Sequence, residues 1–159
     1  MGVFVRQFEA SSDFPCEPQV VFDFLIRPAN MLRLAPPELQ IRLVDGPEVV
    51  QLGSRITLEA RHFGIRQRLA LEVVEFDSDR LLTDEQREGP FGFYRHRRQI
   101  EPQGDGSRMM EVVEFRPPGG MMGMLLSADR LYRYIADLHE HRTQALRRLL
   151  EGEMGARQP

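Results

Sequence analysis

The clearest pattern in the chain is an alternation of polar and apolar residues between positions 84 and 117. Period-two spacing places alternate side chains on one face of a β-sheet. Apolar side chains with a few charges among them are typical of a pocket wall, whereas alternating charges are also typical of a solvent-facing hairpin. The apolar members favour the pocket. The residues expected on this face are Asp84, Gln86, Tyr94, His96, Arg98, Ile100, Met109, Glu111, Val113 and Phe115.

Strands are predicted over most of the chain. Turn-forming pairs such as Phe63-Gly64 and Gly89-Pro90 separate them, and the short connections between the last six favour antiparallel pairing. The expected strands cover residues 3–13, 40–44, 54–61, 65–76, 80–87, 91–102 and 107–117.

Three helices complete the prediction. Pro18 and Pro28 begin short helices over 18–25 and 28–34, because proline is tolerated in a first helical turn. A long helix follows Ser127, its expected N-cap, and runs to Glu151, with a stripe at spacings of three and four that ends at Leu149.

Gly152 is the expected end of that helix. Residues 1–152 would form a single domain and residues 153–159 a disordered tail. The predicted fold class is α+β, with the sheet curved around the last helix.

The composition of the chain limits the classes of partner that we expect it to have. The chain has 159 residues, a net charge of -3 and one cysteine, so an intrachain disulfide is excluded. No basic footprint for nucleic acid is present. No apolar run approaches the roughly 20 residues that span a bilayer, and no signal peptide precedes the first strand. We therefore expect a cytoplasmic protein without stable membrane insertion. A homodimer is compatible with the sequence.

Two motifs resemble those of a known family. The segment DEQREGPF at 84–91, followed by Tyr94, His96 and Arg98, and the segment SRMMEVVEFRPP at 107–118 are similar to motifs of the START-like superfamily, also called SRPBCC. This superfamily includes the birch-pollen allergens. The first motif looks like the pattern of a bacterial branch described as polyketide cyclase/dehydrase-like or ligand-binding.

The resemblance implies a helix-grip fold. In it, a seven-stranded curved antiparallel sheet wraps around a long C-terminal helix, with two short helices between the first and second strands. It implies the activity only weakly, because one fold hosts many functions. Tyr94, Arg98 and Glu111 stand where relatives often carry Trp, His and Asp. A His–Asp pair replaced by Arg–Glu loses a group that titrates near neutral pH.

Turn positions also predict a register. The turns at 89–90 and 103–106 should place the following residues opposite each other: Arg98 and Glu111, His96 and Val113, Asp84 and His96, Gln86 and Tyr94. Directly opposed side chains are close enough to interact. We therefore expect side-chain contacts between Asp84 and His96 and between Arg98 and Glu111.

The first functional hypothesis is a carrier or sensor that binds a hydrophobic or amphipathic small molecule between the sheet and the last helix. Neither a cofactor nor a metal is expected. The expected ligand-binding residues are Phe22, Leu25, Leu58, Leu69, Leu71, Tyr94, His96, Arg98, Glu111, Val113, Leu131, Ile135 and Leu138.

The alternative is a polyketide cyclase or dehydratase-like enzyme. His96 would act as acid or base, Asp84 would orient it, and Arg98 would stabilise a carbonyl or enolate. A structural role for His96, bonded to Asp84, is favoured over this. A third hypothesis is a regulatory or assembly protein. The apolar segment 121–126 would then be an exposed patch, although it also fits a lid or part of the core.

The remaining reactive side chains are expected to be structural. His139 and His141 are two residues apart on the last helix, which differs from the spacing of four in zinc proteases and favours a solvated helix face. His62, beside the Phe63-Gly64 turn, is expected to be exposed. Cys16 is expected to be a small residue in a turn.

Overall fold

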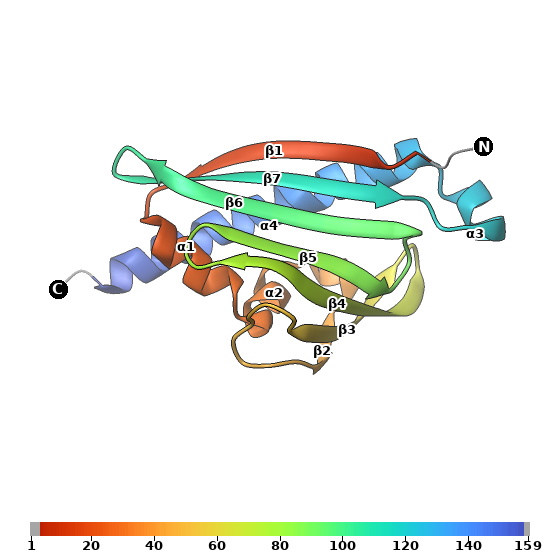
Figure 1. Cartoon of the computed structure of the whole chain (residues 1–159), viewed down its shortest axis with the longest axis horizontal. Helices are drawn as coiled ribbons and strands as arrows, with labels where there is room; N and C mark the ends of the chain where they lie inside the picture. The colour runs from red at the N-terminus through yellow and green to blue at the C-terminus, as the bar shows by residue number, and fades with distance from the viewer. Residues whose placement is uncertain (1–3, 158–159) are drawn as a thin grey trace.

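The computed structural model describes residues 4–157 and contains a single seven-stranded sheet (Figure 1). Every predicted strand and helix is present. The strands are β1 (Arg6–Phe14), β2 (Arg42–Asp45), β3 (Arg55–His62), β4 (Ile65–Asp77), β5 (Leu81–Glu88), β6 (Phe93–Gln103) and β7 (Gly106–Arg116). The helices are α1 (Pro18–Leu25), α2 (Pro28–Leu34), η1 (Pro37–Leu39), α3 (Gly120–Leu125) and α4 (Ala128–Arg157).

The sheet is antiparallel throughout, in the order β1-β7-β6-β5-β4-β3-β2. Figure 1 shows α4 running along one face of this sheet, with α1 and α2 beside it. Register shifts interrupt the β4–β5 ladder between Ala70 and Leu71 and between Val73 and Glu75. Such bulges increase local twist and bend a strand, which helps a sheet to curve around a helix. The arrangement confirms the helix-grip fold predicted from the sequence.

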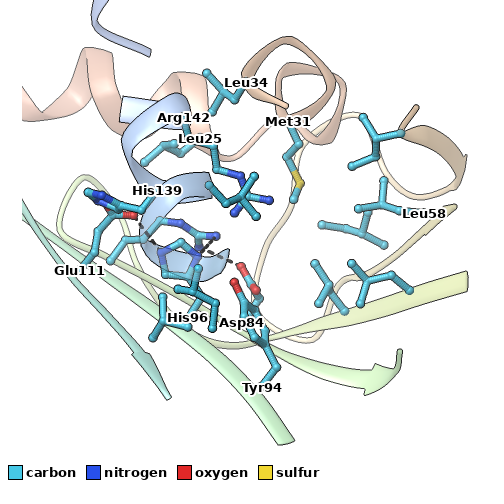
Figure 2. A pocket seen from close by; sticks show the side chains of 18 of the residues that line it. Leu25, Met31, Leu34, Leu58, Asp84, Tyr94, His96, Glu111, His139 and Arg142 are labelled. Atoms are coloured by element: carbon cyan, nitrogen blue, oxygen red, sulfur yellow. Dashed lines mark hydrogen bonds and ion pairs between the residues drawn. The ribbon is translucent and has the colours of Figure 1, made fainter. Parts of the chain in front are cut away.

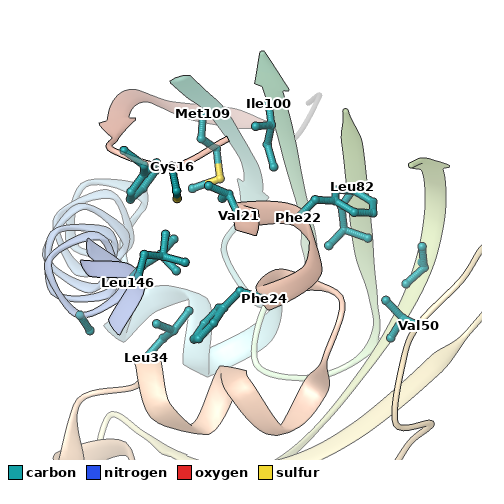
Figure 3. Packing of buried hydrophobic residues seen from close by; sticks show 14 of the residues in the cluster. Cys16, Val21, Phe22, Phe24, Leu34, Val50, Leu82, Ile100, Met109 and Leu146 are labelled. Atoms are coloured by element: carbon teal, nitrogen blue, oxygen red, sulfur yellow. The ribbon is translucent and has the colours of Figure 1, made fainter. Parts of the chain in front are cut away.

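Two apolar clusters hold the helices against the sheet. The larger one joins α1, including Val21 and Phe22, to the C-terminal half of α4 around Leu146 and to the strands (Figure 3). The smaller one joins β1 and β7 to the first part of α4 and includes Phe115 and Leu131. On β7 and on α4, residues of the two clusters are separated by polar side chains that line one pocket, Glu111 on β7 and His139, Arg142 and Thr143 on α4.

Helix α4 begins as predicted but ends later. The Ser127 hydroxyl accepts a hydrogen bond from the backbone N–H of Arg130, as expected of an N-cap. The predicted end at Gly152 is wrong, because the helix continues to Arg157. Leu150 is fully buried and Met154 packs on the larger cluster, so tertiary packing outweighs the helix-breaking tendency of glycine. Residues 153–157 are therefore helical, whereas the rest of the expected tail lies outside the described residues.

The start of the first strand also differs. It was expected from residue 3, which lies outside the described residues, and β1 begins at Arg6. Among residues 4–157, no helix has the length and apolar character that crossing a membrane requires.

Candidate functional site: a pocket between the sheet and α4

A pocket of about 120 Å³ lies between the sheet and α4 (Figure 2). Aliphatic side chains from the short helices, the strands and α4 form most of its wall, and polar side chains from β3, β5, β6, β7 and α4 form the remainder. All the ligand-binding residues expected from the sequence line it except Phe22 and Leu131. The wall also contains residues that were not expected, among them Met31, Leu34, Phe91, His62, Tyr134, His139, Arg142 and Thr143.

Phe22 and Leu131 belong to the core instead. The ring of Phe22 is packed edge-on against Phe76, with 5.4 Å between the ring centroids. Leu131 is 1% exposed and lies in the smaller apolar cluster. Helical spacing identified both as buried but could not distinguish a side chain that fills the core from one that lines a space.

The predicted register of β5, β6 and β7 is confirmed at three of its pairs: His96 lies opposite both Asp84 and Val113, and Arg98 lies opposite Glu111. These polar side chains are buried, so the alternating face is internal rather than solvent-facing. The fourth expected pair is not formed. The β5–β6 ladder ends one residue earlier, and Gln86 instead bonds the backbone N–H and carbonyl of Phe91.

The contacts within this register differ from those predicted. Arg98 donates from Nη1 to Asp84 Oδ2 at 2.8 Å, and His96 Nε2 lies 2.8 Å from Glu111 Oε1. The expected pairs Asp84–His96 and Arg98–Glu111 therefore face each other, but the hydrogen bonds join Arg98 to Asp84 and His96 to Glu111 instead. Both observed pairs run diagonally between strands, a distance that long side chains can bridge. Backbone register alone does not determine which diagonal forms.

His139 of α4 completes this network. Its Nε2 lies 2.6 Å from Glu111 Oε2 and 3.3 Å from the Thr143 hydroxyl. The expected solvated position of His139 is wrong, because its side chain is only 13% exposed. A signal for this existed in the sequence, since His139 lies four residues after the buried Ile135 and four before Thr143. The spacing of two between His139 and His141 does not reveal that periodicity.

Hydrogen bonding fixes the protons of the buried network. Arginine can only donate, so the 3.0 Å contact between Arg98 Nη2 and His96 Nδ1 makes Nδ1 an acceptor. The proton of the neutral ring is then on Nε2, which donates to Glu111. Burial lowers the pKa of His96, and the charge of Arg98 lowers it further. His96 is thus neutral near pH 7.

Glu111 is held as a carboxylate. Burial alone would raise its pKa, but the hydrogen bonds from His139 and His96 lower it well below the usual range. Both ring nitrogens of His96 and two guanidinium nitrogens of Arg98 are already engaged within the network. The network therefore forms a fixed polar wall, with no unengaged nitrogen on His96.

A second polar group lies near the β3–β4 turn. His62 is 7% exposed, so its expected exposure is wrong, and its Nδ1 lies 2.6 Å from the Tyr134 hydroxyl of α4. Phe63 and Gly64 both have positive φ, which forms a tight turn directly after His62, and the Phe63 ring also packs against Tyr134. Burial, followed by the charge of Arg142, lowers the pKa of His62 to about 4.

Other candidate residues lie apart from the pocket. Cys16 is buried in the larger apolar cluster (Figure 3) and does not line the pocket. Met121, Met124 and Leu125 of α3 are exposed, whereas Leu126 is buried, and none of the four lines the pocket. Within the described residues, no group of three or more His, Cys, Asp or Glu side chains is placed to hold a metal ion.

Several solved structures are similar in fold to this chain. The chain is similar to Ara h 8.0201, with 17% identity, a TM-score of 0.70, and coverage of 94% of this chain and 99% of that one. It is also similar to protein CV1439 from Chromobacterium violaceum, with 13% identity, a TM-score of 0.72, and coverage of 91% and 96%. A third similar structure is SA2116 from Staphylococcus aureus, a protein of unknown function, with 7% identity, a TM-score of 0.74, and coverage of 96% and 97%.

These identities are low, so the structural likeness concerns the fold alone. No curated protein matches the chain. A family model described as "Polyketide cyclase / dehydrase and lipid transport" matches residues 5–151, which is nearly the whole chain. The chain therefore belongs to the polyketide cyclase/dehydrase and lipid transport family within the START-like superfamily.

Proposed function

We propose that this protein binds a hydrophobic or amphipathic small molecule in the pocket between the sheet and α4, as a carrier or sensor. The observation that carries the proposal is the composition of the wall. Aliphatic side chains such as Leu58, Leu71 and Ile135 form most of it, and polar side chains form the smaller part. Apolar walls supply affinity and isolated polar groups supply orientation. The family's description, which includes lipid transport, is consistent with such a ligand.

The volume of the pocket limits the size of the ligand that it can hold. The volume of about 120 Å³ is well below the roughly 300–1,000 Å³ that is typical of sites for drug-sized ligands. A single ring or a short acyl segment fits such a space. A longer ligand requires side chains to move, and the flexible Met31 in the wall is suited to that (Figure 2). We therefore expect small ligands to bind without rearrangement and affinity to depend on chain length.

The enzymatic alternative has less support from the contacts. An acid–base role for His96 requires a nitrogen that can exchange a proton with the substrate. Its Nε2 donates to Glu111 and its Nδ1 accepts from Arg98. Asp84, expected to orient His96, is bonded to Arg98 instead. Catalysis by these three residues would require the network to open first.

A ligand screen tests the proposal. Thermal unfolding would be measured with straight-chain alcohols, fatty acids and small aromatic compounds. A ligand that binds only the folded chain raises the melting temperature. Leu138→Trp should abolish the rise, because Leu138 lines the pocket and a larger ring would occupy the free space. Leu52→Trp, at a position 63% exposed, is the matched control and should preserve it. Absence of a rise with every compound would contradict the proposal.

A further inference from the structure

Arg142 is a pocket cation without a carboxylate partner. Among residues 4–157, none of the ion pairs includes it. The two carboxylates in the wall are already bonded, Asp84 to Arg98 and Glu111 to two imidazoles. Figure 2 shows Arg142 extending from α4 into the pocket. Its charge is thus available to a guest molecule.

Three polar side chains of the same pocket interact electrostatically with this guanidinium. Burial raises the pKa of Tyr94, and the charge and hydrogen bonding of Arg142 oppose that shift. Burial likewise raises the pKa of Tyr134 to about 12 against the charge of Arg142. The same charge acts on His62. His62, Tyr94 and Tyr134 line the same pocket as Arg142. Arg142 therefore lies near all three groups.

His62 contributes an unused hydrogen-bonding atom. Its Nε2 is buried and has no partner, although His62 lines the pocket. When the Tyr134 hydroxyl donates to Nδ1, the proton of the neutral ring is on Nε2, which is then a free donor. A buried donor without a partner costs free energy that an acceptor on a ligand would recover.

The charge on this side of the pocket indicates which kind of ligand group would accept these hydrogen bonds. His62, Tyr94 and Tyr134 are all neutral near pH 7, so this side of the pocket carries the single positive charge of Arg142. One cation with neutral donors beside it balances a monoanion better than a doubly charged phosphate. The planar fork of a guanidinium also matches the two oxygens of a carboxylate.

We propose that Arg142, together with the Tyr94 hydroxyl and His62 Nε2, binds the carboxylate of an amphipathic ligand whose apolar part lies among the aliphatic side chains of the pocket. This inference rests on the proposed function, because it specifies the headgroup of the same guest. It predicts a preference for an acid over the alcohol of equal length.

The test compares octanoate with octan-1-ol by isothermal titration calorimetry at pH 7, with wild type and variants. Arg142→Gln removes the charge but keeps a polar side chain. Arg148→Gln removes one charge from an exposed position of the same helix and is the matched control. Wild type should bind octanoate at least tenfold more tightly than octan-1-ol, since a hydrogen bond to a charged group contributes about that factor or more. Arg142→Gln should remove this preference, and Arg148→Gln should retain it.

The outcomes separate the two proposals. Equal affinity for acid and alcohol in wild type, unchanged in Arg142→Gln, would overturn the carboxylate site and leave the proposed function intact. If neither compound binds wild type, both proposals fail. Circular dichroism would establish whether Arg142→Gln is folded. If it is not, Tyr94→Phe replaces it. That variant should weaken octanoate binding more than octan-1-ol binding, and an equal effect on the two would contradict the site.

Discussion

Glu111 on β7 accepts a hydrogen bond from His139 on α4, with 2.6 Å between Oε2 and Nε2. This contact joins the sheet to the long helix across the polar part of the pocket. Because His96 donates to the other oxygen at 2.8 Å, one buried carboxylate links two elements that are distant in the sequence. The polar wall is therefore also a structural connection between the sheet and the helix. Replacing one of its side chains should lower the free energy of unfolding more clearly than it lowers ligand affinity.

Replacing Glu111 should destabilise the fold. Glu111→Gln keeps the size of the side chain but removes the charge that both imidazoles bond. Hydrogen bonds to charged groups contribute about 1.5–3 kcal/mol each, so we expect a loss of about 2–3 kcal/mol in the free energy of unfolding. Urea denaturation at pH 7 measures it. Glu114→Gln, at a half-buried position of the opposite sheet face, should cost much less. Equal losses in the two variants would contradict the structural role of the network.

Stability should fall on mild acidification because of His62. The pKa of its ring falls from 6.5 in the unfolded chain to about 4 in the folded one. The unfolded chain therefore binds a proton more readily, and the contribution of His62 is complete above pH 6.5 and lost as the pH falls towards 4. The full effect would be up to about 3 kcal/mol.

The pH dependence can be assigned by substitution. His62→Asn should reduce the dependence of the unfolding free energy on pH between 6.5 and 4, leaving the part that comes from His96, whose pKa burial also lowers. His141→Asn, at a position that does not line the pocket, should leave it as in wild type. A wild-type slope that survives in His62→Asn would show that other groups produce it.

Loss of a core side chain should mainly lower stability, whereas loss of a pocket side chain should mainly change ligand affinity. Phe22→Ala should cost about 3–5 kcal/mol of stability, because Phe22 is 2% exposed and tightly packed. Leu69→Ala removes a half-buried side chain from the pocket wall and should cost less stability while changing ligand affinity. Chemical denaturation and titration with octan-1-ol measure the two quantities. A larger effect of Phe22→Ala on affinity than on stability would show that it faces the guest.

The end of α4 can be tested at its glycine. A Cβ added to Gly152 would meet no atom within 4 Å, and the residue is helical. Gly152→Ala should therefore stabilise the protein by about 0.5–1 kcal/mol. Gly104→Ala is the contrasting variant, because φ is +56° there and a side chain is strained. No gain from Gly152→Ala would indicate that the helix ends at that position.

The sequence predicted the fold well because period-two and helical spacings, together with turn residues, are local signals. It also placed His96, Arg98 and Glu111 on one internal face, since strand register follows from turn positions. It did not predict which side chains would bond. The choice between direct and diagonal partners depends on side-chain length and on α4, which contributes His139 from a distant part of the chain.

His62 was misjudged for a related reason. Proximity to a turn suggested exposure, but the residue is also the last of a strand whose alternate positions are buried. Extending the alternation of Ile56, Leu58 and Ala60 by one more step places His62 on the inner face. Arg142, by contrast, was not expected in the pocket, and its lack of a carboxylate partner becomes visible only when the surrounding elements are assembled.

Methyl NMR during titration with octan-1-ol tests the central claim most directly. With the leucine methyl groups labelled, the chemical shifts of Leu58, Leu71 and Leu138 in the pocket wall should change together and saturate. Those of the exposed Leu52 and Leu125 should stay constant. Changes confined to the exposed leucines, or no saturable change at the pocket leucines, would contradict a guest between the sheet and α4.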